Sequence, residues 1–117
     1  MDKSTLPSTA FQTFTREAEG HAAAWLEAVE KLGGASSLDA RTGELVYLGI
    51  LAALRLESGI GFHAARAKAL GASREDVISA VLAGLPAAGN AVIQSLPPAL
   101  AAYDGAPEKA DTDTSTG

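Results

Sequence analysis

A histidine near the start of a predicted helix, with charged residues around it, is the feature of this sequence best suited to chemistry. Arg66 follows His63 by three positions, and Glu57 precedes it. An imidazole titrates near neutral pH, so His63 can take up and release a proton during a reaction. Arg66 would lie on the same side of the helix, where a guanidinium can bind an anion. These residue types suit proton transfer next to a positive charge.

Each of these residues also has a purely structural interpretation. His63 can be a core histidine that hydrogen-bonds to the backbone, and Arg66 can be a surface charge. Glu57 fits a solvated turn. Glu44, in the first turns of a predicted helix, is suited to stabilising the helix dipole and to pairing with Arg41. The residue types alone leave these alternatives open.

Composition excludes several classes of function. The chain has 117 residues, which fits one domain, and a net charge of −5 with no basic stripe. We therefore expect no nucleic-acid binding, which needs clustered Lys and Arg. There is no Cys and only two His, so thiolate chemistry and Cys-ligated metals are ruled out. We expect no metal site within one chain and no cofactor, although a metal shared between copies is left open.

The sequence shows no sign of export or of membrane insertion. The N-terminal residues lack the apolar segment of a signal peptide, and the apolar run 45–54 is shorter than the roughly 20 residues that span a bilayer. We expect a cytoplasmic protein without membrane contact. Ala is abundant and aromatic residues make up 5% of the chain, so the core is built from small side chains, and oligomerisation is an expected source of further burial.

Hydrophobic periodicity indicates an all-α fold. Apolar residues recur at gaps of three and four over residues 9–32, which predicts one amphipathic helix ended by Gly33 and Gly34. Asp39 is suited to capping the next helix, over residues 40–56, whose middle is apolar on nearly every side. Such a helix lies at the centre of a domain or against another subunit.

A Gly-containing turn leads into a second helix, over residues 60–70, so that residues 44–73 form a central helical hairpin. Ser73 begins the next helix with a capping-box pattern. Helical pieces are then expected over 87–96 and, after two prolines, over 99–103. Residues 104–117 are polar with nothing to bury and are expected to form a disordered tail, which leaves residues 1–103 as a single domain.

Residues 38–99 resemble the carboxymuconolactone decarboxylase family, which also contains the alkylhydroperoxidase D-like proteins. The similarity rests on four pieces that occur in order: LDARTGEL at 38–45, His63 at the head of the second hairpin helix, GASREDVI at 71–78 and GLPAA at 84–88. The resemblance implies an all-α, alkylhydroperoxidase D-like helical domain. It also implies assembly as a homo-trimer or a hexamer.

The alkylhydroperoxidase branch of the family reduces peroxides with a Glu, a Cys-x-x-Cys pair and a His four positions after the second Cys. By this spacing the Glu corresponds to Glu44, the two Cys to Leu56 and Gly59, and the His to His63. Leu and Gly form neither a thiolate nor a disulfide, so the resemblance argues against thiol peroxidase activity. Peroxide reduction would need a redox group from a partner protein or an added cofactor.

The decarboxylase branch also lacks the Cys pair and keeps the His. The resemblance therefore implies a lyase acting on a small carboxylated lactone of aromatic-ring catabolism, with His63 as acid/base, Glu44 orienting it and Arg66 binding the substrate. Glu44 lies about 18 Å along a straight helix from Leu56, so it meets His63 only through a helix break, a returning neighbour or another subunit. Glu57 is the fallback carboxylate. The alternative is a non-catalytic oligomeric member that binds or assembles.

Overall fold

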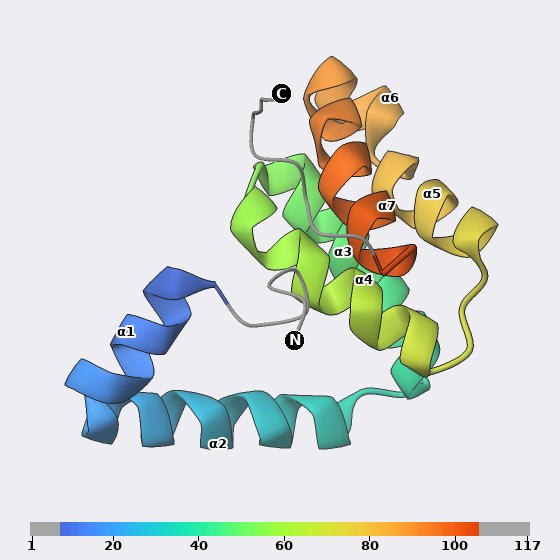
Figure 1. Ribbon diagram of the computed structural model, residues 1–117. Helices are drawn as coiled ribbons and strands as arrows, with labels where there is room; N and C mark the ends of the chain where they lie inside the picture. Colours follow the sequence, from blue (N-terminus) through green and yellow to red (C-terminus); the bar gives the residue numbers. More distant parts are fainter. Residues whose placement is uncertain (1–7, 106–117) are drawn as a thin grey trace.

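The computed structural model describes residues 8–105, which form helices joined by short turns (Figure 1). In chain order these are α1 (Thr9–Glu17), α2 (Glu19–Ala35), α3 (Ala40–Leu54), the 3-10 helix η2 (Glu57–Gly59), α4 (Ile60–Ala69), α5 (Arg74–Leu82), α6 (Leu85–Ala88), the 3-10 helix η3 (Gly89–Ser95) and α7 (Leu96–Tyr103). This part of the chain contains no strand, which confirms the all-α class.

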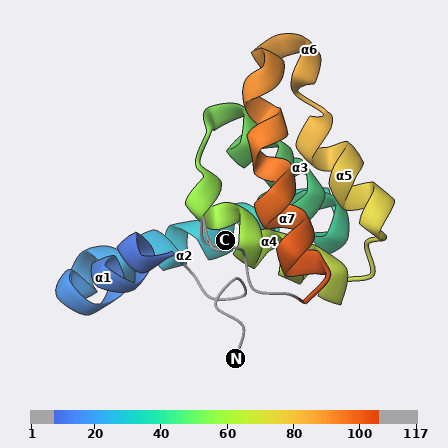
Figure 2. The same cartoon turned by 45° about the horizontal axis from the view of Figure 1, so that its top comes forward.

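The core lies among α3, α4, α5 and α7. Helix α4 packs against α3 and α7, and α5 packs against α3 and α7 on the other side (Figures 1 and 2). The fully buried apolar side chains are small or branched aliphatics, namely Leu48, Ala52, Ile60, Ala64, Ala67, Val77, Val81, Val92 and Ala99. Small residues let the helix axes approach closely, as the Ala-rich composition predicts.

Two predicted helix starts are confirmed. The Asp39 carboxylate accepts a hydrogen bond of 2.7 Å from the Thr42 N–H, and this bond lowers the pKa of the Asp39 carboxyl. At the start of α5 the Ser73 hydroxyl accepts from the Asp76 N–H, and the Asp76 carboxylate accepts from the Ser73 N–H, both at 3.0 Å. This reciprocal pair is the capping box.

The prediction of one helix over residues 9–32 is wrong. The chain leaves the helical conformation at Ala18 (φ −132°, ψ 62°), and α1 folds back to pack against α2. Helix α2 also continues through Gly33 and Gly34 to Ala35. Glycine permits the left-handed cap conformation without imposing it, so two glycines at a helix end do not fix where the helix stops.

The segment after α5 is less regular than predicted. Residues 87–96 do not form one α-helix, because Gly89 takes a positive φ of 78° and the chain continues as the 3-10 helix η3. Pro97 and Pro98 begin α7 instead of interrupting it, since the first turn of a helix needs no N–H donors. Asp104, which we assigned to the tail, pairs with Arg74 at 3.0 Å. The tail prediction otherwise falls outside the described residues.

One stretch, Arg74–Tyr103, is long and apolar enough to pass as a membrane span by length and composition. In the structure it is divided into α5, α6, η3 and α7. The first and last of these helices lie side by side (Figures 1 and 2). The stretch therefore folds back on itself and is not one straight helix of spanning length.

The contact between α3 and α5 requires a residue without a side chain. A Cβ added at Gly49 would lie 2.9 Å from the Ala80 carbonyl oxygen, which belongs to the rigid backbone of α5. We predict that Gly49→Ala lowers the free energy of unfolding by about 1–3 kcal/mol, because the helices must move apart. Gly43→Ala on the same helix meets no atom within 4 Å and should raise stability by up to about 1 kcal/mol. Urea unfolding of both variants checks this, and equal effects would contradict the close approach.

The Arg74–Asp104 pair should contribute to stability in a pH-dependent way. Hydrogen bonds from Arg74 lower the pKa of Asp104 below its ordinary value, so its contribution is present above about pH 4 and is lost as the pH falls further. We predict that Asp104→Asn is less stable than wild type at pH 7 and that the difference shrinks toward pH 3. Urea unfolding at the two pH values measures it. A difference that grows on acidification would contradict the assignment.

Candidate functional site

The structure brings the side chains of Glu44 and His63 into direct contact. Glu44 Oε1 lies 2.8 Å from His63 Nδ1, although the two residues are 19 positions apart in the chain. The Glu44 side chain is 15% exposed and the His63 side chain 23%. Both side chains are thus largely shielded from water. A short hydrogen bond to a carboxylate in such a place holds the imidazole in one orientation.

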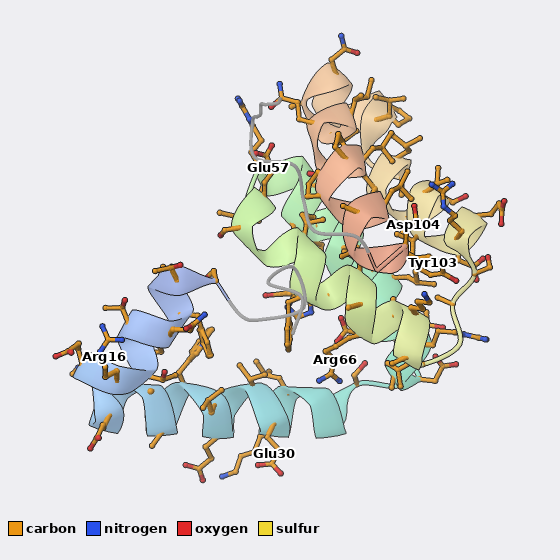
Figure 3. The ribbon with its side chains drawn as sticks, in the orientation of Figure 1. Arg16, Glu30, Glu57, Arg66, Tyr103 and Asp104 are labelled. Carbon is orange, nitrogen blue, oxygen red and sulfur yellow. The ribbon has the colours of Figure 1, made fainter. Side chains whose placement is uncertain are left out.

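Arg66 contacts the other oxygen of the same carboxylate. Its Nε lies 3.1 Å from Glu44 Oε2, and its side chain is 53% exposed. Figure 3 shows Arg66 projecting from α4 on the side that faces α2. The contact with Glu44 is an ion pair at Nε, and the terminal N–H groups of the exposed guanidinium can meet a further anion. The three residues that the sequence singled out therefore form one cluster.

The hairpin geometry explains how Glu44 reaches His63. Helix α3 ends at Leu54, and Arg55 adopts a left-handed conformation (φ 62°) that turns the chain. After η2, helix α4 returns along α3 and packs against it. Of the three routes considered from the sequence, the returning neighbour is the one the structure takes.

The alternative partners considered from the sequence were Glu57 for His63 and Arg41 for Glu44. Neither forms that pair in the described part of the chain. Among the described residues no hydrogen bond or ion pair joins Glu57 to His63, and Figure 3 shows Glu57 at the opposite end of the hairpin from Arg66. Arg41 forms no ion pair with Glu44 within residues 8–105, and its Nη1 lies 3.8 Å from the place that a Cβ on Gly71 would occupy. Glu44 is thus the carboxylate of the site.

Two aromatic rings surround the imidazole, and the sequence reasoning did not assign either to the site. The Tyr47 ring lies 4.6 Å from the His63 ring, centroid to centroid, and the Phe62 ring lies 5.1 Å away, both edge-on. Tyr47 follows Glu44 by three positions, so it shares a helix face with it. That spacing was the available signal for including Tyr47.

Gly59, the position that corresponds to the second Cys of the redox branch, lies beside the imidazole. A Cβ placed there would be 4.0 Å from His63 Cδ2 and 3.4 Å from Leu51 Cδ1. The position is therefore next to the ring, where a side chain would contact it. In this chain the hydrogen atom of glycine occupies the place.

The geometry determines the proton arrangement of a neutral His63. An ionised carboxylate only accepts hydrogen bonds, so the imidazole must carry its proton on Nδ1 when it donates to Glu44. Nε2 then has a free lone pair, and no described residue hydrogen-bonds to it. Within residues 8–105 no three His, Cys, Asp or Glu side chains gather in the manner of a metal site. In this arrangement Nε2 is the ring nitrogen that is left without a partner among the described residues.

This proton arrangement is directly measurable. We predict that the ¹⁵N spectrum of labelled protein shows neutral His63 with the proton on Nδ1, and that Glu44→Gln removes this preference because an amide also donates. His21, exposed and unpaired among the described residues, is the internal control, and His63→Gln assigns the signals. A neutral His63 protonated on Nε2 in the wild type would refute the hydrogen-bond assignment.

In a scan against protein-family models, residues 19–102 match the carboxymuconolactone decarboxylase family. Searches of curated proteins and of solved structures found no match. The matched region is longer than the 38–99 resemblance seen in the sequence, because it begins at α2. It covers well over half of the chain and contains all three residues of the cluster. The protein therefore belongs to the carboxymuconolactone decarboxylase family.

Proposed function

We propose that the protein is a lyase that removes carbon dioxide from a small carboxylated lactone without using a thiol. The observation that carries this proposal is the 2.8 Å contact between Glu44 and His63 Nδ1, which orients Nε2 for proton transfer. Family membership supports the substrate class. The absence of Cys from the sequence directs any chemistry of this site away from thiol redox reactions.

In the proposed step the imidazole acts as a general acid. The bond between the substrate carbon and its carboxylate breaks, carbon dioxide leaves, and the electron pair passes into the conjugated lactone carbonyl. Protonated His63 then donates its Nε2 proton to that carbon and regains a proton from water. Glu44 stabilises the imidazolium, because its carboxylate accepts from Nδ1–H at short range.

Arg66 supplies positive charge beside the imidazole. Binding the departing carboxylate would stabilise the ground state more than the transition state, in which that charge is leaving. We therefore assign the exposed N–H groups of Arg66 to another anionic group of the substrate, or to the enolate oxygen that develops as carbon dioxide leaves. Its ion pair with Glu44 at 3.1 Å keeps the guanidinium in place.

A second candidate function, a non-catalytic family member that only binds or assembles, is favoured by the rings on either side of His63. Tyr47 and Phe62 pack edge-on against the imidazole, and rings in this position also stabilise a histidine whose role is structural. The two candidates differ in whether a substrate turns over.

The lyase proposal predicts turnover that depends on the cluster. Purified protein should release carbon dioxide from 4-carboxymuconolactone or a related carboxylated lactone, measured as loss of substrate and as gas evolved. His63→Gln should lower kcat by a factor of about 10² to 10⁴, the usual contribution of a general acid. Glu44→Gln should cause a smaller loss, because the imidazole remains but is no longer held or charge-stabilised.

His21→Gln is the matched control, since it removes the other histidine of the chain and should keep wild-type turnover. The folding of each variant is verified by circular dichroism. Turnover that survives in His63→Gln would sink the site assignment. A folded wild type inactive on the whole lactone series would favour the non-catalytic alternative.

A further inference from the structure

Three side chains contact the imidazole of His63, and a glycine lies beside it. Glu44 contacts Nδ1 at 2.8 Å, and the rings of Tyr47 and Phe62 pack edge-on at centroid distances of 4.6 and 5.1 Å. Gly59 stands four positions before His63, directly before the first residue of α4. Helical side chains lean toward the N-terminus of their helix, so the imidazole lies over Gly59. This neighbour brings no side chain to the ring.

The local structure does not require a glycine at position 59. Gly59 has a φ of −94° and a ψ of −9°, and other residues also adopt negative φ. An added Cβ would lie 3.4 and 3.9 Å from the two methyl groups of Leu51 and 4.0 Å from His63 Cδ2, all ordinary van der Waals distances. Gly49, by contrast, is needed for the approach of α5. Gly59 therefore leaves room for about one methyl group beside the imidazole.

This room lies on the side of the imidazole that carries Nε2. Cδ2 is the ring atom closest to the place of an added Cβ on Gly59, and Cδ2 is bonded directly to Nε2. Nδ1 is on the other side of the ring and contacts Glu44. Leu51 is buried, whereas Gly59 and His63 are both partly exposed. Leu51 thus closes the inner side of the room, and its outer side faces solvent.

We propose that Gly59 is a specificity-determining residue, over which a substrate reaches Nε2 of His63. Room for about one methyl group admits the unsubstituted edge of a small flat ring and excludes an edge that carries an alkyl group. The flat ring of a small lactone meets this requirement, and in naming that ring the inference rests on the proposed function. Access to Nε2 over Gly59 is measured independently of it, with a reagent that needs no turnover.

The first test follows the reaction of His63 with diethyl pyrocarbonate, a small electrophile that acylates a free imidazole nitrogen. Mass spectrometry should show acylation of His63 about three- to tenfold slower in Gly59→Ala than in wild type, because the added methyl group narrows the approach to Nε2. Gly59→Leu, with a larger side chain, should react more slowly still. His21 is exposed, and its acylation rate should be the same in every variant. An unchanged rate at His63 in Gly59→Ala would overturn the proposal.

Gly84→Ala is the matched control. Gly84 has nearly the same backbone conformation (φ −88°, ψ 6°) and, like Gly59, stands directly before a helix. An added Cβ there would lie 3.5 Å from Ala53 Cβ and 3.9 Å from Val92 Cγ1, with no atom of His63 within 4 Å. His63 should react at the wild-type rate in this variant. Equal slowing in both alanine variants would contradict the proposal, because the effect would then come from altered packing.

A spectroscopic measurement separates blocked access from a displaced ring. In Gly59→Ala the ¹⁵N signals of neutral His63 should still show the proton on Nδ1, because the contact with Glu44 does not involve Gly59. Slower acylation together with a lost preference for Nδ1 would refute the proposal, since the methyl group would then have moved the imidazole. Circular dichroism checks that each variant is folded.

Turnover tests the specificity itself. On 4-carboxymuconolactone, Gly59→Ala should lower kcat/KM by about tenfold or more, mainly through a higher KM, whereas Gly84→Ala should keep the wild-type value. If wild type turns the lactone over and Gly59→Ala does so equally well, the substrate does not approach over Gly59 and the proposal fails. If wild type is inactive on the lactone, the proposed function fails, and the acylation rates still decide whether Gly59 controls access to Nε2.

Discussion

The carboxylate of Glu44 is the interaction on which the rest of this structure depends. One oxygen contacts the imidazole of His63 and the other contacts the guanidinium of Arg66. Two helices are thereby tied together by a charged group that is only 15% exposed. A carboxylate in such a position is stable because both of its oxygens have partners. The same bonds fix which nitrogen of the imidazole is free.

The packing of small residues makes that contact feasible. Helix α3 must be approached by α4 on one side and by α5 on the other, and Gly49 allows the second approach at the Ala80 carbonyl. A larger core would separate the helices and move Glu44 away from His63. The small side chains of the core are therefore connected to the site and not only to the fold.

Much of the fold followed from the sequence, because local signals agreed with the tertiary structure. Asp39 and Ser73 cap helices by bonds to residues three positions away, and such bonds are set locally. The break at Ala18 and the 3-10 segment after Gly89 were missed, since they depend on how neighbouring helices pack. Periodicity describes one helix at a time and carries no information on such breaks.

The residues of the site could be predicted from the sequence, but the contacts between them could not. Family spacing pointed to Glu44 and His63, while the distance along a straight helix argued against their meeting. The turn at Arg55 resolves that conflict, because a left-handed residue there sends α4 back along α3. Tyr47 was missed because an aromatic residue in an apolar helix has the same appearance in sequence whether it packs in a core or beside a histidine.

The most direct measurement of the central claim is a double-mutant cycle between Glu44→Gln and His63→Gln, read as the free energy of unfolding in urea. A charge-assisted hydrogen bond in this partly buried setting predicts a coupling of about 1–2 kcal/mol between the two substitutions. Additive effects, with a coupling indistinguishable from zero, would mean that the carboxylate does not hold the imidazole and would contradict the account.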